Sequence, residues 1–260
     1  MQPDLLTLLS PKNIVIFVII FTRIGGMIAS APLFSHYPMP EQVKIWLSAL
    51  VAFILFPMIS STIHIVMPTD FPGLFIYLLR EFAVGFMIGF IMNLIFAAVQ
   101  IAGEFISIQI GISMSQILDP VTGASSPILS QMFIILASFV FLALNAHQWL
   151  FAAIYKSYTA FPPGLDFVFT GGVVENILHL SGQMFFIAIS MILRVFCVMF
   201  VSEVLMGFMS KMMPQMNIFM VAIPFKIYIG VILILMFISP TATYLSNTIQ
   251  SYFQGIVEMM

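Results

Sequence analysis

Long apolar stretches separated by short polar segments make up most of this chain. The stretches cover about residues 14–34, 45–67, 71–103, 128–155, 177–210 and 217–239. Apolar and polar residues do not alternate within them, which favours helices over the strands of a membrane barrel. The segments between them, such as HYPMPE at 36–41 and MPTDFPG at 67–73, carry prolines and glycines that end helices. The pattern therefore predicts an all-α protein.

Two of the stretches, 71–103 and 177–210, are longer than one membrane crossing requires. A bilayer core of about 30 Å needs about 20 helical residues. Each of these stretches would form a helix of roughly 50 Å at about 1.5 Å per residue. Either they break into hairpins, or they continue beyond the bilayer inside a protein assembly. Both alternatives argue against a simple six-helix bundle.

Composition indicates a membrane protein. Apolar residue types make up 62% of the 260 residues and charged types 7%, whereas soluble domains have about 45–50% and about 25%. Eight basic and ten acidic residues cannot cover a soluble surface of this size. We therefore expect an integral membrane protein that forms a single domain over residues 1–260.

The tail at 240–260 is less apolar than the stretches that precede it. Its large apolar residues recur at helical spacing and are Leu245, Ile249, Tyr252, Phe253 and Ile256. This spacing predicts a short amphipathic helix at the end of the chain.

Several charged residues lie within or at the edges of the apolar stretches, where an unpaired charge is costly. They are Arg23, Arg80, Glu81, Glu104, Arg194, Glu203 and Lys226. Neighbouring residues on a helix point in different directions, so Arg80 and Glu81 cannot pair with each other. We expect most of these charges to have partners on other helices or in other subunits. All of them except Arg23 are candidates for such contacts. An ion or proton relay is the alternative, but the carboxylates are not grouped.

Small residues predict two faces on which helices can approach closely. Gly85 and Gly89 have the GxxxG spacing, and Gly26 and Ser30 have the same spacing in the first stretch.

A loop of small polar residues, GISMSQILDPVTGASSP at 111–127, interrupts the apolar sequence, and Asp119 is its only charged residue. Its Gly-x-Ser, with His147 downstream, raises the alternative of an intramembrane serine protease. The Gly-x-Ser-x-Gly form is not met, because Ser115 occupies the last position.

The sequence contains no recognisable metal site. The four histidines are scattered, Cys197 is the single cysteine, and no metal-ligand spacing occurs. We expect no enzymatic activity, metal or cofactor.

Short motifs along nearly the whole chain resemble one family. They are RIGG at 23–26, APLF at 31–34, PEQVK at 40–44, Gly103-Glu104, Gln109, Gly111, Asp119-Pro120, PQMNIF at 214–219, PFKI at 224–227 and Gly230. In this order and spacing they resemble FliR, the flagellar biosynthetic proteins of the type III export gate.

The resemblance implies a channel-forming core component of the flagellar export gate, in the bacterial inner membrane at the flagellar basal body. Unfolded flagellar subunits would pass through the channel during flagellum assembly. The implied fold has long, bent helical hairpins rather than a simple bundle. The implied partners are FliP-like and FliQ-like gate subunits, FlhB-like and FlhA-like export components, the unfolded substrates and membrane lipid, with no nucleic acid.

The resemblance also implies that the loop at 111–127 projects into the channel and helps to plug it; an ordinary turn between two helices is the alternative. The loop residues are Gly111, Ile112, Ser113, Met114, Ser115, Gln116, Ile117, Leu118, Asp119, Pro120, Val121, Thr122, Gly123, Ala124, Ser125, Ser126 and Pro127. Two further functions stay open: the equivalent subunit of a virulence injectisome and, more weakly, a small-molecule or ion transporter.

Overall fold

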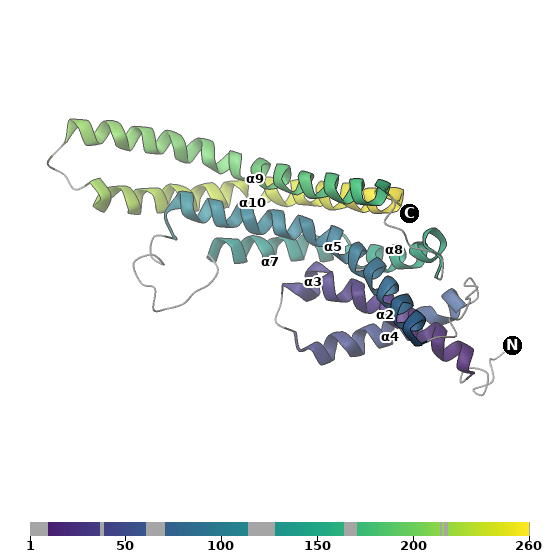
Figure 1. Ribbon diagram of the computed structural model, residues 1–260. Helices are drawn as coiled ribbons and strands as arrows, with labels where there is room; N and C mark the ends of the chain where they lie inside the picture. The colour runs from purple at the N-terminus through teal and green to yellow at the C-terminus, as the bar shows by residue number, and fades with distance from the viewer. Residues whose placement is uncertain are drawn as a thin grey trace. The chain divides into compact units, whose positions relative to one another are not determined.

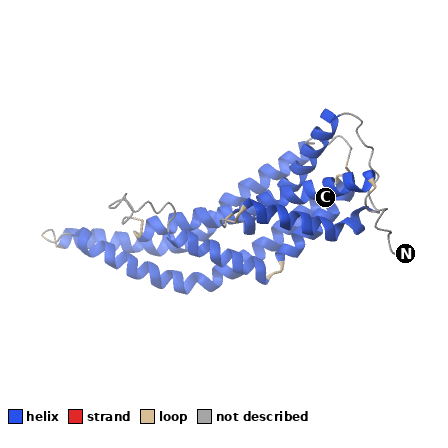
Figure 2. Ribbon diagram, turned by 90° about the horizontal axis from the view of Figure 1, so that it is seen from below, coloured by secondary structure: helices blue, strands red, loops and turns tan. Residues whose placement is uncertain are grey.

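The computed structural model describes residues 10–36, 39–60, 71–113, 128–163, 171–213, 215 and 218–259. Every regular element within these ranges is a helix (Figure 2). In chain order the helices are α2 (Pro11–Ser30), α3 (Pro32–Ser35), α4 (Glu41–Ser60), α5 (Phe71–Ile110), α7 (Ile128–Ala143), α8 (Ala146–Ala160), α9 (Gly171–Met212) and α10 (Ile218–Met259) (Figure 1).

Five helices of the described chain are long and apolar enough to cross a membrane, or six if α7 and α8 form one broken span. This confirms the prediction of an all-α integral membrane protein. Three of these helices exceed one crossing: α5 has 40 residues, and α9 and α10 have 42 each. At about 1.5 Å per residue each is roughly 60 Å long, about twice the hydrocarbon thickness of a bilayer.

The two overlong stretches do not break into hairpins, because α5 and α9 run through them without interruption. A break occurs instead inside the stretch 128–155, between α7 and α8. Asn145 lies at this break with a φ of 55°. The left-handed region is accessible to asparagine at small cost, because its short polar side chain can hydrogen-bond locally. The apolar pattern continues across the break and therefore did not reveal it.

The C-terminal tail is not a separate short helix. It forms the last turns of α10, which continues through Pro240. The residues at helical spacing pack as the sequence pattern suggests: Leu245, Ile249, Tyr252 and Ile256 are buried, and Phe253 is partly buried. Proline within the helix is compatible with a membrane setting, where neighbouring groups can satisfy the freed carbonyl.

The chain divides into two compact units, and three helices contribute residues to both. Unit 1 comprises residues 1–94, 145–180 and 249–260. In it α2 packs on α4, and the end of α10 is held by a hydrogen bond from Tyr252 Oη to the Leu180 carbonyl at 2.9 Å. The rings of Trp149 and Phe253 also lie against each other, with centroids 5.0 Å apart and an angle of 32° between their planes.

Unit 2 comprises residues 95–144 and 181–248. Its core includes an edge-to-face contact between Phe96 of α5 and Phe141 of α7, with centroids 5.9 Å apart. The Ser130 hydroxyl donates to the Gln100 carbonyl at 3.2 Å and joins the same two helices. That all of residues 1–260 form a single domain stays a prediction.

Within unit 1, the two small-residue faces lie against each other. A Cβ atom added at Gly26 would lie 2.9 Å from the Phe86 amide nitrogen, and one added at Gly85 or Gly89 would collide with the α2 backbone. The Ser30 hydroxyl donates to the Phe86 carbonyl at 2.8 Å, a hydrogen bond from α2 to α5. The contact between α2 and α5 is therefore one of backbone against backbone, which only small residues allow.

This contact predicts different effects for two adjacent glycines. Gly26→Ala should lower the stability of the purified protein by about 1–3 kcal/mol, because the new methyl group has no space. Gly25→Ala is the matched control, since a Cβ there meets nothing within 4 Å. Thermal unfolding in detergent measures both. Equal losses for the two variants would contradict the close contact.

Candidate functional site

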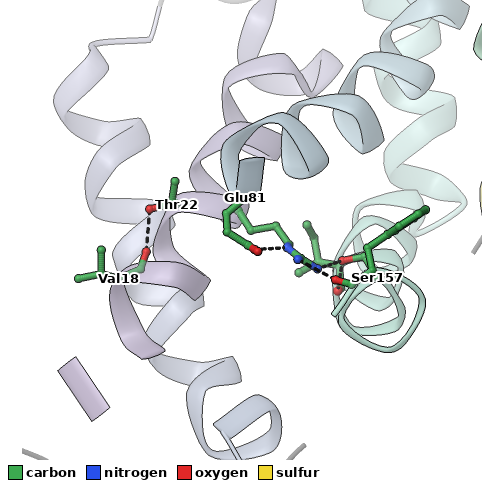
Figure 3. Close-up of polar contacts among 7 residues, drawn as sticks. Val18, Thr22, Glu81 and Ser157 are labelled. Carbon is green, nitrogen blue, oxygen red and sulfur yellow. Dashed lines mark hydrogen bonds and ion pairs between the residues drawn. The ribbon is translucent and has the colours of Figure 1, made fainter. Parts of the chain in front are cut away.

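A fully buried arginine joins three segments of unit 1. Arg23 of α2 is 1% exposed. Its Nε donates to Glu81 Oε2 of α5 at 2.7 Å, its Nη1 to the Ser157 hydroxyl of α8 at 2.9 Å, and its Nη2 to the Phe161 carbonyl at 3.0 Å. Figure 3 shows Glu81 and Ser157 on either side of this group. The guanidinium also lies 4.0 Å from the centre of the Tyr158 ring.

The glycine contact positions this ion pair. Arg23 precedes Gly26 by three residues, and Glu81 precedes Gly85 by four, so each charge lies one turn from a glycine on the same helix face. Because the α2 and α5 backbones touch at these glycines, the two side chains meet directly. Neutralisation and full hydrogen bonding are what a buried charge requires.

Sequence reasoning identified Glu81 as a charge that needs a partner on another helix, and the structure supplies Arg23. Arg23 was noted as a charge in an apolar stretch but was not among the candidate site residues. Ser157 and the Phe161 carbonyl were missed, because a serine or a backbone carbonyl carries no signal in the apolar pattern. Arg80, next to Glu81, is half-buried on α5.

A second polar contact joins three helices of unit 2. Lys226 Nζ of α10 donates to Glu203 Oε1 of α9 at 2.6 Å, and Gln109 Nε2 of α5 donates to the same oxygen at 3.3 Å. The Lys226 side chain is 24% exposed and that of Glu203 38%. Both charges were candidates, and the structure brings them together within the chain. Glu104 instead accepts a hydrogen bond from Gln100 of its own helix at 3.1 Å.

The contact at Glu203 lies beside the start of the loop at 111–127. Ile110, the last residue of α5, fills the space that a side chain at Gly230 of α10 would need, since a Cβ there would lie 2.5 Å from Ile110 Cγ2. Gly111 follows with a φ of 89°, a conformation that favours glycine. The Ser113 hydroxyl then donates to the Ser107 hydroxyl at 2.9 Å. The predicted loop residues 114–127 lie outside the described residues.

The helix that follows the loop, α7, is also closely packed against α5. Gly103 of α5 lies against Ser130 of α7, and a Cβ at Gly103 would be 2.5 Å from Ser130 Cα. The two helices that flank the loop are therefore in backbone contact within two or three turns of it.

Arg194, the remaining candidate, lies on α9 in unit 2 with its guanidinium 5.0 Å from the centre of the Tyr244 ring. Among the described residues no group of three or more His, Cys, Asp or Glu side chains could hold a metal ion. The contacts of Glu81, Arg194, Glu203 and Lys226 join helices to one another. This arrangement is suited to holding a multi-helix assembly in shape.

The buried pair predicts a non-additive mutational effect. Arg23→Met alone leaves Glu81 buried without its partner and should cost about 3–5 kcal/mol. Arg23→Met combined with Glu81→Met should cost less than the sum of the single changes, because no buried charge remains. Thermal unfolding of the purified variants measures the effect.

The control is Glu41→Gln, which breaks the exposed Glu41–Lys44 pair and should change stability by no more than about 1 kcal/mol. Additive losses at Arg23 and Glu81 would mean that the two side chains do not depend on each other.

Comparison with known proteins identifies the family. Residues 14–252 match the family described as "Bacterial export proteins, family 1". A relative in Bacillus subtilis (strain 168), named Flagellar biosynthetic protein FliR, is 31% identical over 229 residues, which cover 86% of each chain. Proteins of the same name in Caulobacter vibrioides and Escherichia coli (strain K12) are 27% and 24% identical, and the matches cover 88% and 92% of this chain and 91% and 90% of theirs. The chain therefore belongs to the FliR family of flagellar biosynthetic proteins, within the bacterial export proteins of family 1.

Proposed function

We propose that this protein is a component of the flagellar type III export gate in the bacterial inner membrane, where it contributes to the passage of unfolded flagellar subunits. The observation that carries the proposal is the family match over residues 14–252, together with relatives named for flagellar biosynthesis. Those names favour the flagellar system over a virulence injectisome. The role is that of a structural, channel-forming subunit and not of an enzyme.

The length of the apolar helices supports a place inside a larger assembly. Large apolar side chains are exposed along α9 from Leu178, which is 67% exposed, to Met212, which is 82% exposed. The two residues are about 50 Å apart along the helix at about 1.5 Å per residue. A hydrocarbon core of about 30 Å cannot cover both ends within the usual range of tilt. The rest of this surface needs protein partners, for which FliP-like and FliQ-like subunits are our proposal, with FlhB-like and FlhA-like components nearby.

The loop at 111–127 is the proposed channel plug. Its first residues follow a tightly packed helix end, with Ile110 against Gly230 and Ser113 bonded to Ser107. These contacts fix the position of the α5 end from which the loop begins. Its single charge, Asp119, gives it little attraction for ions, as a seal against ion leak requires.

Removal of the gene tests the function. A deletion strain should lose swimming motility and should secrete no flagellar subunits into the medium, and the wild-type gene should restore both. The neutral variant Gly25→Ala should restore them equally well. A deletion strain that still builds flagella, or one that loses only virulence effector secretion, would refute the flagellar role.

Removal of the loop tests the plug. Deletion of residues 113–125 should leave the gate assembled but increase its ion leak, measured as loss of membrane potential in cells that express the complex. A glycine–serine segment of equal length at these positions separates the effect of sequence from that of shortening. An unchanged leak in a fully assembled gate would contradict the plug.

A further inference from the structure

A small cavity lies in the core of unit 2, where α5, α7, α9 and α10 meet. Its volume is about 10 Å³. Most of its lining is apolar and includes Ile106, Phe133 and Ile234. The two polar residues in the lining are Arg194 of α9 and Thr241 of α10.

Arg194 has a donor without an acceptor. Its Nη1 atom is buried and has no hydrogen-bond partner in the described part of the chain. The face of its guanidinium is covered by the Tyr244 ring at 5.0 Å, which stabilises the charge but accepts no N–H hydrogen bond in the guanidinium plane. Arg23 differs, because its Nε, Nη1 and Nη2 atoms all have acceptors. An unsatisfied N–H on a charged group in an apolar core is costly.

Thr241 is the second polar group at the cavity. It is 6% exposed, and it belongs to the lining together with Arg194. The next two threonines of α10 bond within their own helix: Thr243 donates to the Ser239 carbonyl at 3.2 Å, and Thr248 to the Tyr244 carbonyl at 2.8 Å. Thr241 therefore offers a hydroxyl at the cavity that Arg194 also lines.

The cavity size limits what that partner can be. One water molecule needs about 10–15 Å³ of space for its centre, and a bound water needs two to four polar contacts. A carboxylate group, a lipid headgroup or an acyl chain is too large. We propose that Arg194 and Thr241 bind one buried water molecule, which accepts a hydrogen bond from Arg194 Nη1 and exchanges a second with the Thr241 hydroxyl.

This water has a structural consequence for unit 2. It links α9 to α10 through a polar bridge. It also gives the Arg194 guanidinium, which has no carboxylate partner among the described residues, an acceptor for its Nη1 hydrogen. The site does not depend on the proposed export role, because it rests only on the cavity and on the two polar groups that line it.

A mutant cycle on the full-length protein, purified in detergent with any subunits that accompany it, tests the water site. Thr241→Val keeps the side-chain shape but removes the hydroxyl, and should lower the unfolding temperature by about 2–4 °C. Thr241→Ser, which keeps the hydroxyl, should retain most of the stability. In a protein that already carries Arg194→Met, Thr241→Val should not lower the unfolding temperature further, because the water bridge is already broken.

An equal loss from Thr241→Val with and without Arg194 would overturn the bridge, since the hydroxyl would then act alone. A density map of the wild-type protein at a resolution that shows ordered water gives the second test. A peak within hydrogen-bonding distance of Arg194 Nη1 and Thr241 Oγ1 supports the site. An empty cavity, or one filled by a side chain of another subunit, overturns it.

Discussion

The charge of Arg23 must be satisfied within an apolar interior, and this requirement determines how the helices of unit 1 meet. Its three nitrogen atoms donate to Glu81, Ser157 and the Phe161 carbonyl, which lie 58, 134 and 138 residues further along the chain. The pair can form only because α2 and α5 approach closely at their glycines. Small residues and buried charges are thus two parts of one contact, and neither would be stable in this position without the other.

Three cations of the apolar helices have three different surroundings. Arg23 is fully buried and fully bonded, whereas Lys226 forms a partly exposed ion pair with Glu203 that Gln109 of a third helix joins. Arg194 lies against the Tyr244 ring and lines a cavity, and no ion pair with a carboxylate of the described residues accompanies these contacts. The Glu203 contact lies beside the loop base, so the polar interactions of unit 2 hold together the helices from which the proposed plug extends.

The sequence was sufficient for the fold class, the approximate helices and the close-packing residues, because apolar runs and small-residue spacing are local signals. The requirement that Glu81 and Glu203 have partners on other helices could also be predicted from the cost of a membrane charge. The identity of those partners could not, since Arg23 and Glu81 are 58 residues apart and no spacing rule links them. The break at Asn145 was missed because apolar residues continue on both sides of it. The continuity of α10 was missed because the tail at 240–260 is less apolar than the stretch before it.

We infer that these overlong apolar helices belong to a shared export assembly. The decisive experiment is native mass spectrometry of the tagged protein, expressed with the FliP-like and FliQ-like genes of the same organism and purified in detergent. We expect one large complex that contains this chain together with both partners. A stable monomer or homodimer that excludes both partners would contradict it, because the exposed apolar length of α9 would then need no protein cover.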